Sequence, residues 1–111
     1  MIDISFVFKI KADFLRALAH PARLKIIEHL KNGEKSVGEI GKALEMEQSG
    51  LSKHLAILKH AGILKSRQQK VTVYYSIRDN GIFDVLRPIS LFLKKKLKES
   101  QEALNHLGKE S

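Results

Sequence analysis

Apolar residues recur at helical spacing along most of this chain. From Phe6 to Ala19 an apolar side chain occupies every fourth position, which is typical of a helix with one buried face. Pro21 suits the first turn of a second helix, and Asn32-Gly33 suits its end. The residues predicted to be buried in that second helix are Leu24, Ile27 and Leu30.

Two further short helices are predicted. Ser36 and Glu39 have the spacing of a capping box, in which each side chain bonds the other residue's backbone amide. The next helix is expected over residues 48–60 and has two unlike faces. Its apolar stripe consists of Leu51, Leu55 and Leu58. The side chains predicted to face outward are Ser49, Ser52, Lys53, Ala56 and Lys59.

The pattern then becomes alternating. Residues 63–68 and 71–77 are predicted to form two strands joined by a tight turn at Gln69-Lys70, with Val71 on the apolar face of the second strand. A long helix is predicted over residues 82–108, because apolar residues return to a three–four spacing. The sequence thus predicts one mostly α-helical domain over residues 1–111, in the order α-α-α-α-β-β-α, with a small β-hairpin wing.

Positive charge is concentrated in the middle of the chain. The formal net charge is +8, and the stretch from Gln48 to Arg78 holds six Lys or Arg and no Asp or Glu. The preceding stretch, Glu34 to Glu47, is instead rich in Glu. A basic cluster on a compact motif is typical of a nucleic-acid binder, because neutralising phosphates releases condensed counterions.

The composition excludes several classes of function. There is no cysteine, so the chain forms no disulfide, thiolate metal site or cysteine redox switch. No stretch approaches the roughly 18 apolar residues that span a bilayer, and the N-terminus does not have the pattern of a secretory signal. The carboxylates are scattered, with no nucleophile, glycine loop or ligand cluster beside them. We therefore expect a cytoplasmic protein that is not an enzyme, uses no cofactor and does not bind membranes.

Two short helices followed by a basic hairpin are the parts of a winged helix-turn-helix, whose second helix enters the major groove of DNA. Gln48 can bond adenine through two hydrogen bonds, serine can donate or accept, and lysine reaches guanine or phosphate. Lys59 is expected to add salt-dependent affinity. The wing, residues 65–76, is expected to meet the DNA backbone or minor groove. Its predicted contact residues are Arg67, Gln69, Lys70 and Thr72, with Arg67 and Lys70 at the hairpin tip.

Five segments in order along the chain carry a specific resemblance. They are Leu18–Ile27, Ser36–Ile40, Gln48–Leu55, Leu58–Ile63 and Val73–Ile77. These segments resemble the ArsR/SmtB family of bacterial and archaeal repressors. The resemblance implies a homodimer that binds double-stranded DNA. The positions it implies for base and backbone contacts are those of Gln48, Ser49, Ser52 and Lys53, with Val37 and His54 as supports.

The resemblance also implies that the first and last helices, residues 5–19 and 82–108, build the dimer. The last helix agrees, because it is too long and apolar to bury both sides against a four-helix core; the alternative is that it folds back on its own subunit. A two-fold dimer would place its recognition helices about 34–36 Å apart. The predicted interface residues are Phe6, Ile10, Phe14, Leu86, Ile89, Leu93, Leu97 and Leu104.

The chain departs from the family pattern at the metal sites. Ser36 and Gly38 stand where thiolates would be needed, and His106 has no neighbouring acid–histidine pair. No metal site is therefore expected, and an effector would be an unidentified small molecule or a protein. Glu47 replaces the usual Ser or Thr cap of the recognition helix, and the wing tip lacks its usual glycine.

Two other classes of function remain open. An architectural DNA-binding protein would show a ratio of specific to non-specific affinity near one, whereas a repressor would show about 10³ or more. A winged helix can also serve as a protein-interaction module, whose binding face is typically apolar or acidic. The acid-free stretch from Gln48 to Arg78 argues against that module.

Overall fold

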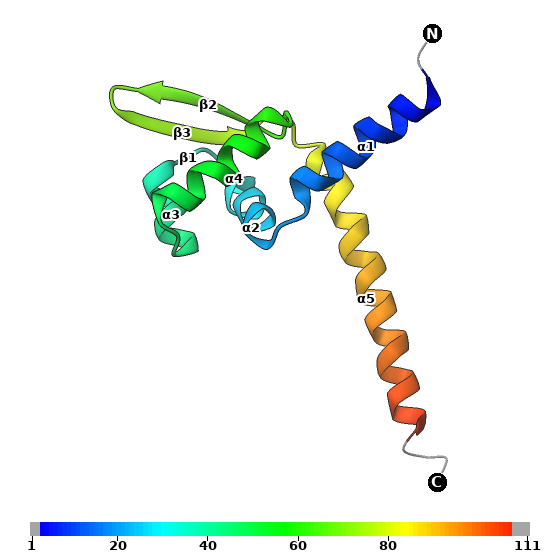
Figure 1. Cartoon of the computed structure of the whole chain (residues 1–111). Helices are drawn as coiled ribbons and strands as arrows, with labels where there is room; N and C mark the ends of the chain where they lie inside the picture. Colours follow the sequence, from blue (N-terminus) through cyan, green and yellow to red (C-terminus); the bar gives the residue numbers. More distant parts are fainter. Residues whose placement is uncertain (1–2, 108–111) are drawn as a thin grey trace. The chain divides into compact units, whose positions relative to one another are not determined.

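The computed structural model describes residues 3–107 (Figure 1). Its elements are α1 (Ile4–Leu18), α2 (Pro21–His29), the 3₁₀ turn η1 (Leu30–Asn32), β1 (Lys35–Ser36), α3 (Val37–Leu44), α4 (Gln48–His60), β2 (Leu64–Gln69), β3 (Thr72–Ile77) and α5 (Ile82–Leu107). The predicted order of five helices and a hairpin is confirmed, and β1 is an additional short strand. Position 108, the predicted end of the last helix, lies outside the described residues. The chain divides after Asp79 into two compact units.

The start of α2 follows from its first residues. Pro21 occupies the first turn, as predicted, and His20 is the N-cap. The Nδ1 atom of His20 accepts a hydrogen bond from the Ala22 amide at 3.0 Å, in the way that a Ser or Asp side chain usually does.

The buried face of α2 differs from the prediction. Ile27 and Leu30 are buried as expected, but Leu24 is 43% exposed and Ile26 is fully buried. Residues 26, 27 and 30 share one side of a helix at 100° per residue, and Leu24 lies at its edge. Ile27 and Leu30 therefore belong to two possible apolar stripes, one with Leu24 and one with Ile26. The stripe with Ile26 is the one that is buried.

The capping box at the start of α3 is confirmed. Ser36 Oγ accepts a hydrogen bond from the Glu39 amide at 3.1 Å, and the Ser36 amide donates to Glu39 Oε1 at 3.0 Å. Gly41 lets the following helix approach closely: a Cβ atom there would lie 3.2 Å from the Met46 carbonyl oxygen and 3.4 Å from Leu51 Cδ2. Glu45 ends the helix in the left-handed region, with φ at 54°.

The three predicted leucines of α4 form the centre of the first unit. Leu51, Leu55 and Leu58 are at most 1% exposed, and α4 contacts α1, α2, α3 and β2. Other fully buried side chains around them are Ile26, Ile27, Leu30, Ile40 and Leu64. The apolar stripe of the helix is thus the part of α4 that the core uses.

The sheet has the strand order β1-β3-β2 and is antiparallel throughout. Gln69 pairs with Thr72, so the two-residue turn is Lys70-Val71 and not the predicted Gln69-Lys70. Lys70 has φ at 57°, as the first central residue of a primed hairpin turn requires. Val71 is 94% exposed and does not belong to the apolar face of β3. Figure 1 shows the hairpin projecting beyond α3 and α4.

The second unit consists chiefly of α5. Its 26 residues include Pro88, which lacks the amide hydrogen that an interior helix residue donates. Large apolar side chains on α5 are exposed, including Leu91, Phe92 and Leu97. Among the described residues, no helix is long and apolar enough to cross a membrane.

The left-handed residue after α3 gives a test of the fold. Glu45→Gly should raise the free energy of unfolding by about 1 kcal/mol relative to Glu45→Ala, because glycine has no Cβ to oppose a positive φ. Both substitutions remove the same charge, so their difference isolates the backbone term. Equal urea midpoints for the two variants would contradict the left-handed conformation.

Candidate nucleic-acid interface

The polar side of α4 is exposed. Gln48, Ser49, Ser52 and Lys53 are all exposed: Ser49 and Lys53 lie opposite the buried leucines, Ser52 lies at the flank, and Gln48 is in the first turn of the helix. Glu47 occupies the N-cap, and its side chain makes no capping hydrogen bond. The first amides of α4 are therefore open to an external acceptor such as a phosphate oxygen.

A hollow lies between the start of α3, the start of α4 and the turn of the wing. Its volume is about 470 Å³. It brings together three of the predicted contact residues from different elements, namely Val37, Gln48 and Thr72. The wing and the first turn of α4 thus border one concave surface.

Arg67 does not lie at the tip of the wing, contrary to the prediction. It stands opposite Tyr74 within the strand pair, with its guanidinium 4.5 Å from the centre of that ring. Its Nε and Nη2 atoms donate to the two carboxylate oxygens of Glu34 at 2.8 and 2.7 Å, and Nη1 donates to Gln69 at 2.9 Å. The hydrogen bonds from Arg67 lower the pKa of Glu34, and Glu34 in turn raises the pKa of Arg67. Glu34 therefore balances this positive charge.

Lys59 links α4 to the wing. Its Nζ atom donates to Ser66 Oγ on β2 at 2.7 Å. The ammonium group is exposed, so Lys59 can fix the wing against the helix and still attract phosphates. Lys70 lies exposed in the turn between the two strands.

His54 turns inward from the polar side of α4. It is half-buried, its ring centroid lies 4.3 Å from that of His20, and its Nδ1 atom is buried without a hydrogen-bond partner among the described residues. Burial lowers the pKa of His54, and the neighbouring His20 and Arg23 lower it further. This placement suits a support of the helix rather than a DNA contact. Within residues 3–107, no three metal-ligating side chains form a cluster.

Apolar side chains cover the faces of α1 and α5, each considered by itself. On α1, Phe6 and Ile10 are each 53% exposed and Phe14 is half-buried. On α5, Leu86 is half-buried, and the other predicted interface residues are exposed: Ile89, Leu93, Leu97 and Leu104. Exposed apolar surface of this extent is typical of a protein interface.

Three residues that bear on this surface were missing from the predicted set, namely Glu34, Ser66 and His20. Glu34 reaches Arg67 across the sheet, 33 positions away in the sequence. No local spacing indicates such a pair, because the two-residue strand β1 is too short to give a pattern of its own.

The half-buried histidine gives a prediction for stability. Because its pKa in the folded protein is below its ordinary value of 6.5, the unfolded chain takes up the proton more readily. The free energy of unfolding should therefore fall as the pH is lowered through about 6.5. His54→Gln, which cannot be protonated, should reduce this fall in urea titrations, and His60→Gln on the same helix should not. If the free energy of unfolding of His54→Gln depends on pH as strongly as that of the wild type, the lowered pKa of His54 is contradicted.

The pairing of Arg67 gives a prediction for DNA affinity. Glu34→Gln should free the guanidinium charge and make the dependence of log K on log salt steeper by up to about one. Glu28→Gln, which removes the same charge from the exposed side of α2, is the matched control. If both variants behave like the wild type in duplex titrations, Arg67 is not near the DNA.

Comparison with known proteins agrees with this architecture. A family model described as bacterial regulatory protein, arsR family, matches residues 20–66, from the cap of α2 into β2. The uncharacterised HTH-type transcriptional regulator Rv0081 of Mycobacterium tuberculosis is 34% identical over 91% of this chain and 90% of its own length. Its crystal structure superposes with a TM-score of 0.77 over 85% of this chain and 95% of that one, at 35% identity.

Two further relatives add detail. The transcriptional repressor PagR of Bacillus anthracis is 38% identical, over 70% of this chain and 82% of its own length. The homodimeric winged helix-turn-helix DNA-binding domain Mb0332 of Mycobacterium bovis, solved by NMR, gives a TM-score of 0.74 at 25% identity, over 86% of this chain and 88% of that one. The chain therefore belongs to the arsR family of bacterial regulatory proteins and has their winged helix-turn-helix fold.

Proposed function

We propose that this protein is a homodimeric transcriptional repressor that binds a palindromic operator and blocks a promoter. One observation carries the proposal: α4 buries three leucines and leaves its polar side exposed, at the start of a stretch without Asp or Glu. Such a helix is stable in position and offers hydrogen-bonding side chains to the major groove. No catalytic step and no cofactor belong to this mechanism.

The polar side of α4 divides into two kinds of contact. Gln48, Ser49 and Ser52 carry polar groups that can hydrogen-bond to base edges, and Gln48 can make two hydrogen bonds to adenine. Lys53 reaches guanine or phosphate, and Lys59 approaches phosphates while bound to Ser66. Sequence choice then depends on the first two turns of α4, and salt-dependent affinity on the lysines.

The wing adds backbone or minor-groove contacts. Lys70 is the exposed charge at its turn, with Gln69 and Thr72 flanking that turn. Gln69 accepts a hydrogen bond from Arg67, so the ordered Arg67 side chain holds Gln69 in place beside the turn. Val37 and His54 support the surface from α3 and from the inner side of α4.

The dimer follows from the uncovered apolar faces. The exposed residues on α1 and α5 match what a second copy of the chain would bury, and the relative Mb0332 is homodimeric. A two-fold axis would place the two copies of α4 about 34–36 Å apart, on half-sites one turn of DNA apart.

Selection of bound duplexes from a random DNA pool, at about 150 mM salt, tests the proposal. We expect an inverted repeat with half-sites one turn apart, bound about 10³-fold or more above random DNA. Placing that repeat over a promoter should then reduce transcription in a purified system. Tight binding without any enriched motif would contradict sequence-specific regulation.

Two substitutions separate base reading from charge. Gln48→Ala should cost about 1–3 kcal/mol on the selected operator and flatten the preference at one base pair. Lys70→Ala should weaken all sequences alike and reduce the salt slope by about one. Fluorescence anisotropy with operator and scrambled duplexes measures both. An unchanged salt slope in Lys70→Ala would remove the wing from the interface.

A further inference from the structure

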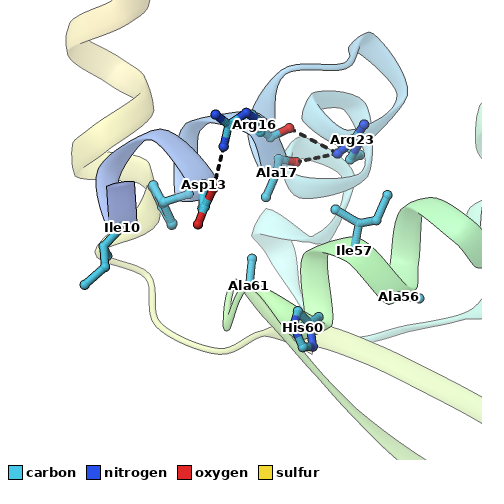
Figure 2. Close-up of a pocket in the computed structure, with 10 residues that line it drawn as sticks. Ile10, Asp13, Arg16, Ala17, Arg23, Ala56, Ile57, His60 and Ala61 are labelled. Carbon is cyan, nitrogen blue, oxygen red and sulfur yellow. Dashed lines mark hydrogen bonds and ion pairs between the residues drawn. The ribbon is translucent and has the colours of Figure 1, made fainter. Parts of the chain in front are cut away.

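A second cavity, larger than the hollow beside the wing, lies within the first unit. It has a volume of about 800 Å³ and is lined by residues of α1, α2 and α4 (Figure 2). Ile10, Phe14 and Ala17 line it from α1, Ile57 lines it from α4, and Ala61 lines it from the C-cap of α4. Its size falls within the range of small-molecule sites, and it is bordered mainly by apolar side chains.

Positive charge borders this apolar space. The polar lining comprises Arg16, Arg23, Asp13 and His60. Asp13 is already paired with Arg16, and it accepts a hydrogen bond from Lys9 at 3.0 Å. No acidic partner for Arg23 is found in the described part of the chain. The border therefore has an excess of cationic groups over free carboxylates.

Arg23 is ordered but incompletely bonded. Its Nη1 atom donates to the carbonyl oxygens of Arg16 and Ala17 at 3.2 and 3.3 Å, as Figure 2 shows. Its Nε atom is buried and has no hydrogen-bond partner among the described residues. Arg23 lines the cavity, is fixed by the end of α1 and has no acidic partner among the described residues, so its accessible guanidinium hydrogens suit a carboxylate or sulfonate; the buried Nε is not the atom that a ligand would reach.

We propose that this cavity binds a small amphipathic organic anion, with its apolar body between α1 and α4 and its acidic group at Arg23. An apolar lining beside a guanidinium suits an aromatic or aliphatic acid. Ile10 and Phe14 also belong to the proposed dimer interface, so in the dimer this cavity would border the partner subunit. Charge favours an anionic occupant near Arg23, because the apolar face of a partner helix would not neutralise the guanidinium.

The position of the cavity gives it a regulatory consequence, which rests on the proposed function. Ile57 belongs to the same helix as Gln48 and Ser52, and Ala61 is the C-cap of that helix. A ligand that orders or displaces α4 in this place changes the free energy of DNA binding, and DNA changes ligand affinity by the same factor.

The site can be tested on the full chain without DNA. The probes are 1-anilinonaphthalene-8-sulfonate, an aromatic anion, and N-phenyl-1-naphthylamine, which lacks the sulfonate. We expect one molecule of the sulfonate per protomer in a fluorescence titration. Ile57→Glu should weaken it at least tenfold, and Leu24→Glu should not. Leu24 is the matched control because it is 43% exposed against 39% for Ile57 and lies outside the cavity.

Arg23 is tested by the ratio of the two affinities. Arg23→Met should weaken the sulfonate about tenfold more than the neutral amine, whereas Arg23→Lys, which keeps the charge, should leave their ratio near that of the wild type. Using the ratio separates the loss of charge from any loosening of α1. Equal weakening of both probes by Arg23→Met would overturn the assignment of the anion to Arg23.

Three results would overturn the site or its coupling. Equal effects of Ile57→Glu and Leu24→Glu would show that the dye binds elsewhere. Dissociation of Ile57→Glu dimers in sedimentation, with unchanged dye affinity per protomer, would assign the cavity to a second copy.

Saturating sulfonate should change duplex affinity at least threefold in the wild type. Dye binding without that change would overturn the coupling, and a failure to bind any DNA would overturn the proposed function alone.

Discussion

The burial of Leu51, Leu55 and Leu58 is the interaction on which the rest of this structure depends. A fully buried leucine contributes about 1.5–3 kcal/mol relative to an exposed one, and these three lie at most 1% exposed in the middle of the first unit. They fix the rotation of α4 about its own axis, and that rotation decides which side chains reach solvent. The exposed polar side of the helix is therefore a consequence of core packing.

Electrostatics then sets what this surface offers. Arg67 is paired with Glu34, Lys59 donates a hydrogen bond to Ser66, and His54 has a lowered pKa. Three side chains of the basic segment therefore interact with other parts of the protein. Lys53 and Lys70 lie exposed on the proposed surface and form no ion pair among the described contacts. The wing is held to β1 and to α4 by these side chains, which gives DNA an ordered surface to meet.

The sequence was most informative where one residue type has one structural use. The capping box at Ser36, the proline start of α2 and the leucine stripe of α4 were all predicted, because each depends on neighbours within one or two turns. Predictions that depend on contacts between residues far apart in the sequence were less accurate. Placing the turn required the register of β2 and β3, and the pairing of Arg67 required a two-residue strand more than thirty positions away. The inward turn of His54 required the position of His20.

The central claim is that the polar side of α4 and the turn of the wing form the DNA-binding surface. Amide chemical-shift mapping by NMR, with the full chain titrated by its selected duplex at about 150 mM salt, tests this most directly. The account predicts the largest shifts at residues 48–53 and around Lys70, with small shifts along the far part of α5. Largest shifts on α1 or α5, with the first two turns of α4 unchanged, would contradict it.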